Sequence, residues 1–338
     1  ARARGAPSSG ARARRLQMGL LTNLRTTILS ALAAPLELSA RLAPLEPNPP
    51  TFSARVIANY PHDSGAFTQG LCWDAGTGTM LESTGMYGRS SVRRVDPRSG
   101  RVLQSEAMPR TQFGEGLTLH DGRCVQLLWH GGKGLVRDPK TFKVQHQFEL
   151  PEGCDQGWGL THDGGEQLFL SDGSANIYVL DARDFGLRRT LPVRAGRAPL
   201  RRINELQFIR GQLWANLWGD QRLAVISPTS GAVQRFVDLS GLMSPAERRR
   251  LEDPREHVLN GIAHDEQGDR LFVTGKCWPN IFQVSVHSPT GAWPEASEFV
   301  SPPLDGGEIA RRPLQGFQGF QGRTAAERAA QRAARSAE

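Results

Sequence analysis

The amino-acid sequence predicts an all-β fold, a five-bladed β-propeller with a short helical insertion before the last blade. One strand–turn–strand layout occurs five times along the chain, and successive copies are 46, 43, 46 and 56 residues apart. Repeats of about 40–50 residues with four strands each are typical of propeller blades. The 37 glycines and 22 prolines among 338 residues also favour a turn-rich, strand-rich fold over a helical bundle.

Each copy contains a short first strand, a turn that carries glycine and a second, more apolar strand, which is a hairpin signal. The anchor pairs of the first strands are Gly70-Leu71, Gly116-Leu117, Gly159-Leu160, Glu205-Leu206 and Gly261-Ile262. The second strands are expected at 79–85, 123–129, 167–173, 212–218 and 270–276. The copies lack the Gly-His and Trp-Asp pairs of WD40 repeats.

The longest step is explained by an insertion at Ser244–Glu256. Ser244 is a candidate N-cap, Pro245 takes the first helical position and Glu247 follows the cap by three residues, so a short helix is expected. The segment Ala54–Tyr60 precedes the first copy and has no blade of its own. It is predicted to supply the outer strand of the last blade, which closes the ring and covers a sheet edge.

The net charge of +7 belongs mainly to the two ends of the chain. Residues 1–15 hold five arginines and no acid, and the stretch from Arg311 onward is again rich in arginine. The centre is close to balanced, which argues against nucleic-acid binding. We therefore expect a basic, low-complexity N-terminal extension over 1–50, a propeller domain over 51–300 and a basic tail over 301–338 that is disordered or forms an exposed helix. We expect a monomer.

The apolar segment Leu20–Leu38 is interrupted by Arg25 and Glu37 and follows several arginines. This arrangement resembles a degraded signal anchor or part of an organelle transit peptide and favours the secretory pathway or an organelle over the cytosol. The alternative is a low-complexity extension. The four cysteines have no CxxC spacing, so the sequence leaves both their pairing and the redox compartment open.

A candidate site emerges where equivalent positions of the copies differ. The residues just before the anchors are Gln69, Glu115, Trp158, Asn204 and Asn260. In a propeller these starts of the innermost strands meet around one mouth of the central channel, where loops on a rigid scaffold carry function. The ends of the second strands add Trp129, Trp218 and Lys276, and two aromatic residues, Phe67 and Phe113, precede Gln69 and Glu115.

These residues combine one carboxylate, one ammonium, several amides and a wall of aromatic rings. An aromatic environment excludes water and raises the pKa of a carboxyl group, which suits it to proton transfer near neutral pH. The eight histidines show no HExxH and no spacing paired with cysteine. We therefore expect no metal and no cofactor.

Several of these segments resemble the glutaminyl-peptide cyclotransferases of plants and bacteria. The segments, within about 54–284, are YPHDSGAFTQGL (60–71), ESTGMYG (82–88), FGEGLT (113–118), GWGLTHD (157–163), NEL (204–206), WANLW (214–218), DLSGL (238–242), LNGIA (259–263) and LFVTGKCWP (271–279). The resemblance implies a five-bladed propeller that cyclises the N-terminal glutamine of peptides to pyroglutamate with release of ammonia, an acyltransferase reaction. Its partners would be peptides or proteins with N-terminal glutamine.

Carried over by position, the resemblance implies that Glu115 is the catalytic proton carrier. Lys276 and Asn204 would complete the catalytic set, and the substrate-binding residues would be Phe67, Gln69, Phe113, Trp129, Trp158 and Trp218. The chain departs from the pattern at Gln156, where similar proteins tend to have Glu, at Cys277, which replaces a larger apolar residue, and over His130–Lys133. These changes affect the expected pocket rim and leave the proton carrier in place.

Two other functions stay open at this level. A non-catalytic propeller could bind peptides through its top face, although a scaffold has no need for Glu115, Asn204 and Lys276 together. A metal-dependent hydrolase such as a lactonase would need several carboxylates in the channel, and the five equivalent positions offer only Glu115. Should Glu115 not carry the proton, Glu82 is the next candidate.

Overall fold

The computed structural model describes residues 48–289, 297–299 and 301–304, which belong to a compact unit, Asn48–Glu338. Residues 1–47 of the expected N-terminal extension and residues 305–338 of the expected C-terminal tail lie outside the described residues. Within the described ranges, no helix is long and apolar enough to cross a membrane.

Three sheets each contain four consecutive antiparallel strands, as the repeated hairpins predict. The first is β2 (Thr68–Asp74), β3 (Thr79–Thr84), β4 (Ser91–Val95) and β5 (Val102–Ala107). The second is β6 (Gly114–His120), β7 (Arg123–Leu128), β8 (Lys133–Arg137) and β9 (Val144–Glu149). The third is β10 (Leu160–His162), β11 (Gln167–Ser171), β12 (Asn176–Asp181) and β13 (Leu187–Pro192).

The remaining main strands form one sheet, in the order β16-β17-β18-β19-β1-β22-β21-β20, with β23 on β22. One half is β16 (Ile203–Ile209), β17 (Gln212–Leu217), β18 (Arg222–Ile226) and β19 (Val233–Asp238). The other is β20 (Leu259–Asp265), β21 (Arg270–Gly275), β22 (Asn280–His287), β23 (Ser297–Glu298) and β1 (Thr51–Pro61). A small ribbon, β14 (Arg194–Ala195) with β15 (Ala198–Pro199), precedes β16.

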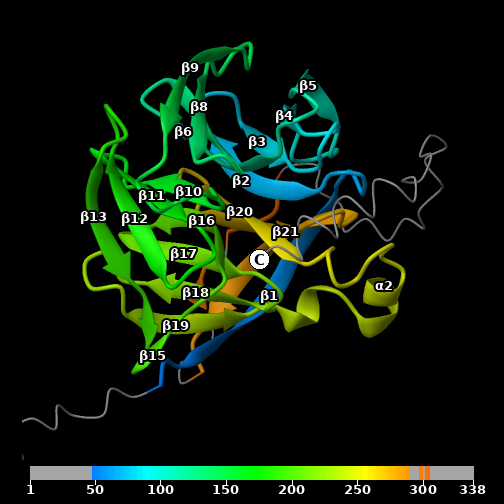
Figure 1. Ribbon diagram of the computed structural model, residues 1–338. Coiled ribbons are helices and arrows are strands. Elements are labelled where there is room, and N and C mark those ends of the chain that lie inside the picture. Colours follow the sequence, from blue (N-terminus) through cyan, green and yellow to red (C-terminus); the bar gives the residue numbers. More distant parts are fainter. Residues whose placement is uncertain (1–47, 290–296, 300, 305–338) are drawn as a thin grey trace, which may run out of the picture. The chain divides into compact units, whose positions relative to one another are not determined.

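The first strands of these groups contact one another in a closed cycle, β2 to β6, β10, β16, β20 and back to β2. Burial decreases away from this cycle: β2 and β6 are almost wholly buried, whereas β5, β9 and β13 are mostly exposed. Figure 1 shows β2, β10, β16 and β20 together in the middle and β5, β9 and β13 at the periphery. The unit is therefore all-β and propeller-like, with its innermost strands around a common centre.

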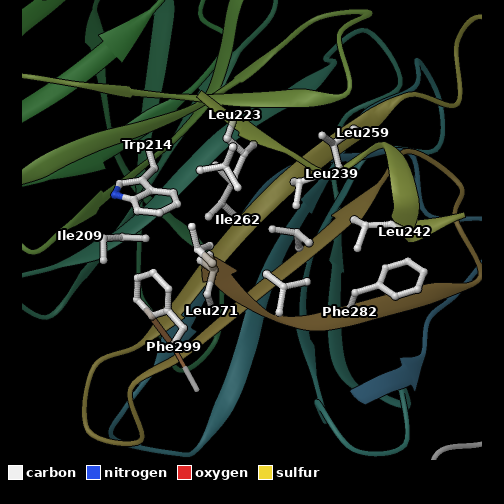
Figure 2. Close-up of a cluster of buried hydrophobic side chains, with 14 of the residues drawn as sticks. Ile209, Trp214, Leu223, Leu239, Leu242, Leu259, Ile262, Leu271, Phe282 and Phe299 are labelled. Atoms are coloured by element: carbon white, nitrogen blue, oxygen red, sulfur yellow. The ribbon is translucent and has the colours of Figure 1, made fainter. Parts of the chain in front are cut away.

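Apolar side chains fill the wedges between neighbouring groups of strands. The cluster in Figure 2 lies between β16–β19 and β20–β22, and its large members include Trp214, Phe282 and Phe299. Burying each large apolar side chain stabilises the fold by about 1.5–3 kcal/mol. Because every wedge joins two groups, the inner strands are held rigidly enough to fix side chains at their ends.

The prediction that Ala54–Tyr60 closes the last group of strands is confirmed. β1 runs antiparallel to β22, with Ala58 opposite Gln283 and Tyr60 opposite Ile281. The start of β1 also pairs in parallel with β19, which merges two groups into one sheet. After β19 come η1 (Ser240–Leu242) and α2 (Pro245–Arg249), which is shorter than the insertion in which a helix was expected. Ser244 and Glu247 form a reciprocal capping box at its start.

Candidate active site

Three of the residues that precede the anchors form one buried hydrogen-bonded chain. Gln69 Nε2 donates to Glu115 Oε1 at 2.9 Å, and Asn260 Nδ2 lies 3.3 Å from Gln69 Oε1 and 3.0 Å from the carbonyl oxygen of Thr68. All three side chains are buried. The chain of amides therefore fixes the Glu115 carboxylate from strands that are far apart in sequence.

The backbone explains why these residues point inward. The register between first and second strands shifts across Gln69, Glu115 and Asn260, and also across Asn204. Such β-bulges redirect side chains and recur beside active sites. The adjacent Gly116 is needed because a Cβ there would lie 2.5 Å from the Trp158 carbonyl oxygen. The inner strands thus approach each other too closely for any larger residue at this anchor.

Aromatic side chains form a wall next to this chain. Phe67, Met86, Phe113 and Trp129 make one buried cluster, against which Trp158 packs. Phe67 meets Phe113 edge-on at 6.2 Å, and the Phe113 and Trp129 rings are 5.0 Å apart. A Cβ on Gly85 would meet both the Phe113 ring and the Gln69 side chain, so the amide that bonds Glu115 lies beside this wall.

Lys276 is the cation of the site. Its side chain is buried, and Nζ lies 4.8 Å from the centroid of Phe67 in a cation–π contact. The backbone on either side is fixed, because Lys276 N donates to Val258 and Cys277 N donates to Ala66. The position of Nζ over Phe67 thus links the ammonium to the wall beside Glu115.

Asn204 is buried on β16, and its Oδ1 has no hydrogen-bond partner among the described residues. Buried polar atoms are almost always paired, so this amide oxygen at the end of an inner strand could accept a hydrogen bond from a ligand. A flip of the amide exchanges oxygen and nitrogen, so Asn204 can accept from an amine or donate to an oxyanion.

The predicted substrate residues do not all lie in one cluster. Phe67, Phe113, Trp129 and Trp158 lie together, as described above. Trp218 follows β17, is only partly buried and lies under the Arg202 guanidinium, 5.5 Å from its carbon to the ring centroid. Two backbone hydrogen bonds connect Trp218 to the region of Trp158. Trp218 N donates to the Arg202 carbonyl oxygen, and Arg202 N donates to the carbonyl oxygen of Gly173. The Trp158 ring lies on Gly173.

Gln156 has a role that the sequence did not reveal. Its Oε1 accepts hydrogen bonds from the indole nitrogens of both Trp129 and Trp158, each at 3.0 Å. The other departures also touch this wall, since the His130 ring lies tilted against the Trp129 ring at 4.2 Å and Cys277 packs against the aromatic cluster. The departures therefore change the wall itself, as well as the rim where they were expected.

Tyr87 is a second residue that the sequence did not single out, although it lies in the segment 82–88. Its ring packs edge-on against Phe113 at 5.4 Å, and the residue as a whole is 42 % exposed. Burial of part of the side chain, together with the negative charge of Glu115, raises the pKa of Tyr87. Tyr87 thus covers the outer side of the wall near Glu115.

A second carboxyl group lies among the inner strands, so Glu115 is not their only acid. Glu205 occupies the anchor position at which the other four copies have glycine, and it is buried. Its Oε2 accepts from the backbone nitrogen of Ile262 at 3.0 Å, and the backbone of Leu71 also hydrogen-bonds the carboxyl group. Burial raises its pKa well above the ordinary value, against the effect of these bonds. Glu205 therefore ties three inner strands together.

Glu82, the alternative proton carrier, is unsuited to that task. It is fully buried and accepts from Thr68 Oγ1 at 2.7 Å, from His62 Nε2 at 3.0 Å and from the Arg93 guanidinium. Burial alone would raise its pKa, but the charges of Arg93 and His62 outweigh burial and hold it far below the ordinary range. A carboxylate that is saturated in this way is structural.

The described residues contain no group of three or more His, Cys, Asp or Glu side chains placed to hold a metal ion. They do place a carboxylate fixed by an amide and a buried ammonium at the same aromatic cluster, and Asn204 adds a buried amide oxygen without a partner on the inner strand β16. Such a set can move a proton and stabilise a developing negative charge beside a dry wall.

Both the sequence and the fold of the chain match those of known proteins. The sequence pattern of the glutamine cyclotransferase family matches residues 26–286, and so extends further toward the N-terminus than the motifs quoted above. The chain is 41 % identical to a glutaminyl-peptide cyclotransferase of Arabidopsis thaliana over 233 residues, which is 68 % of this chain and 70 % of the relative. The crystal structure of Myxococcus xanthus glutaminyl cyclase superposes with a TM-score of 0.64 at 30 % identity, over 70 % of this chain and 98 % of that one. The chain belongs to the glutamine cyclotransferase family of enzymes.

Proposed function

We propose that this enzyme converts the N-terminal glutamine of peptides to pyroglutamate, releases ammonia, and uses Glu115 as its proton carrier without a metal. The observation that carries the proposal is the fixed Glu115 carboxylate, held by Gln69 and adjoining the aromatic wall on which the Lys276 ammonium lies. The family membership supports glutamine as the residue that is cyclised.

In this reaction the α-amine of the substrate attacks the carbon of its own side-chain amide. A C–N bond forms and closes a five-membered ring, the amine loses a proton to Glu115, and Glu115 returns that proton to the leaving amide nitrogen. The C–N bond to that nitrogen then breaks and ammonia departs, so atoms and charge balance without water. One carboxylate is sufficient because the nitrogen that loses the proton and the nitrogen that receives it are bonded to the same carbon during the reaction.

The remaining polar residues have complementary roles. The Lys276 ammonium and the Asn204 amide would stabilise the negative charge that develops on the amide oxygen during attack. Gln69 would keep the carboxylate of Glu115 directed at the substrate. The burial of Lys276 supports this role, since a charge acts more strongly where water is excluded.

The aromatic residues would hold the glutamine in a curled conformation. The two reacting groups are already tethered, so a site that selects the ring-forming conformer provides much of the acceleration. An α-amine has a pKa of about 7.7–8.0 and is appreciably neutral near pH 7, so no Lewis acid is needed to create the nucleophile. This is the basis for proposing a metal-independent reaction.

We also propose that the propeller has five blades. Three are the separate four-stranded sheets, and the long sheet would be two blades, β16–β19 and β20–β22 with β1, joined edge to edge. The closed cycle of five first strands supports this count. The catalytic unit would cover residues 51–300, with 1–50 and the C-terminal tail as accessory parts. Contacts continue slightly past residue 300, since Leu304 N donates to the Tyr60 hydroxyl at 2.9 Å.

The direct experiment is incubation of the purified chain with an amidated peptide that begins with glutamine, while ammonia and pyroglutamate are measured with and without a chelator. We expect equal release of both products, unchanged by the chelator. The same peptide with an acetylated N-terminus is the control and should not react, because its nitrogen is no longer a nucleophile. Absence of product would favour a binding propeller, and loss of activity with chelator would contradict the metal-independent mechanism.

A further inference from the structure

A surface depression of about 560 Å³ lies beside Trp218. It is lined by the segment Leu200–Arg202 before β16 and by the β17–β18 turn with its flanks (Leu217–Arg222). Thr51, Asp238 at the end of β19 and Ser240 just after it complete the lining. None of these residues except Trp218 has a part in the mechanism above. The depression therefore offers a site next to the region in which the glutamine is proposed to bind.

Two of the three arginines that line this depression form no ion pair with a carboxylate of the described residues. Arg222 is paired with Asp220, through Nε to Oδ1 at 3.1 Å and Nη2 to Oδ2 at 2.7 Å. Arg201 and Arg202 are exposed, and neither forms an ion pair with a carboxylate of the described residues. Asp238, the other carboxylate of the lining, acts on Arg222, whose pKa it helps to raise. The lining thus presents two guanidinium groups that have no ion-pair partner among the described residues, next to an aromatic ring.

Arg202 is held in place by its backbone. Its φ is +65°, in the left-handed region that a residue with a side chain rarely adopts. Two hydrogen bonds maintain this conformation, from Arg202 N to Gly173 and from Trp218 N to the Arg202 carbonyl, each 2.8 Å long. The contact between its guanidinium and the Trp218 ring fixes the side chain as well.

These bonds also relate the depression to the aromatic wall. A Cβ on Gly173 would lie 2.7 Å from the Trp158 ring, so Trp158 lies directly on the residue to which Arg202 is bonded. Arg202 is therefore bonded directly to the Trp218 backbone and, through Gly173, is linked to the residue on which the Trp158 ring lies. A peptide whose first residue binds at the wall and which leaves on this side would run past Arg202 and Arg201.

We propose that this depression is a carboxylate-binding subsite for an acidic residue downstream of the substrate's N-terminal glutamine, an inference that rests on the proposed function. Guanidinium groups bind carboxylates with two parallel hydrogen bonds, which gives selectivity as well as attraction. An Asp or Glu side chain within the first few residues after the glutamine would be favoured, and a Lys there would be disfavoured. The subsite thus sets substrate preference and takes no part in the chemical step.

The test uses amidated tetrapeptides that begin with glutamine and carry either Glu or its neutral isostere Gln at position two, three or four. We expect the Glu peptide to have a kcat/KM about five-fold higher at one of these positions, which is the scale of an exposed ion pair. In 0.5 M salt the preference should shrink, because salt screens exposed charges. Arg202→Gln and Arg201→Gln should each bring the Glu-to-Gln ratio towards one.

Arg98→Gln is the matched control, since it removes the same charge from an exposed residue in the β4–β5 turn, and it should keep the full ratio. A ratio near one at all three positions would overturn the subsite while leaving the cyclisation intact. A ratio that persists in both arginine variants would also overturn it. Absence of cyclisation with every peptide would instead overturn the proposed function itself.

Discussion

Gln69 Nε2 donates a 2.9 Å hydrogen bond to Oε1 of Glu115, across the gap between the first strands of two neighbouring sheets. This bond and the one from Asn260 to Gln69 make the orientation of the carboxylate depend on three strands at once. The arrangement of the inner strands, and not a local sequence motif, therefore determines the geometry of the proton carrier.

Replacing Gln69 with Leu keeps the approximate size of the side chain and removes its hydrogen bond to Glu115. A hydrogen bond to a charged group contributes about 1.5–3 kcal/mol, so kcat should fall about 10- to 100-fold. KM should change less, because the aromatic wall is unaltered. Steady-state kinetics on a glutamine-initiated dipeptide measure this. The same change at the exposed Gln147 on β9 should have no effect, and a loss of less than three-fold in Gln69→Leu would contradict the positioning role.

Gln156 determines how the two indoles of the wall face the substrate, because one oxygen accepts both N–H groups. Gln156→Leu leaves both indole nitrogens without this acceptor, at about 1 kcal/mol each. KM should rise about 10-fold, with a smaller change in kcat. Gln156→Glu retains an oxygen acceptor and should restore KM. Equal KM values for the Leu variant and the wild type would show that the wall does not depend on Gln156.

Glu82 stabilises the fold through Arg93 and His62, so Glu82→Gln should unfold more easily at pH 7. Breaking a buried ion pair by removing one partner costs about 3–5 kcal/mol. Because the pKa of Glu82 is depressed in the folded state, its contribution is present above the unfolded pKa of about 4.3 and is lost as pH falls through the folded pKa. Denaturant titrations should therefore give a difference between wild type and variant that shrinks below about pH 4. A difference that stays constant to pH 2 would contradict this.

The contribution of Glu205 to folding stability should have the opposite pH dependence. Burial raises its folded pKa, so the associated stability is fully present below the unfolded pKa of about 4.3 and is lost as pH rises towards the folded pKa. Glu205→Gln keeps an oxygen for the Ile262 and Leu71 N–H groups and cannot ionise. The melting temperature of Glu205→Gln should exceed that of the wild type at pH 8. The difference between the two melting temperatures should disappear at pH 4.

Glu205→Ala is the comparison, since it leaves these N–H groups without that acceptor. It should be destabilised at every pH, by about 1–3 kcal/mol for each buried unpaired group. A Gln variant as unstable as the Ala variant at pH 8 would mean that the ionised carboxylate is what the inner strands require.

Much of the site could be predicted because its residues occupy equivalent positions in the repeated strands. Equivalent positions of a repeated strand meet around one centre, so Gln69, Glu115 and Asn260 could be placed together from their spacing alone. Glu205 was visible as the one anchor that is not glycine, but its contacts with Ile262 and Leu71 depend on how far the inner strands approach each other.

The contacts of the loops could not be predicted in the same way. Gln156 joins two tryptophans through a single oxygen, and Tyr87 covers Phe113 from a loop between β3 and β4. Both depend on loop conformation, which the repeat does not specify. Glu82 was the alternative proton carrier because the sequence does not show that His62, 20 residues before it, and Arg93, 11 residues after it, both bond its carboxylate.

The most direct test of the mechanism is the steady-state kinetics of Glu115→Gln on a glutamine-initiated dipeptide, with circular dichroism to confirm folding and the exposed Glu149→Gln as the matched control. The amide has nearly the same shape but cannot move a proton, and general acid–base groups typically contribute about 10²- to 10⁴-fold, so kcat should fall by that factor while KM changes little. A folded Glu115→Gln enzyme that retains more than about a tenth of the wild-type kcat, below the range for such a group, would show that another residue carries the proton.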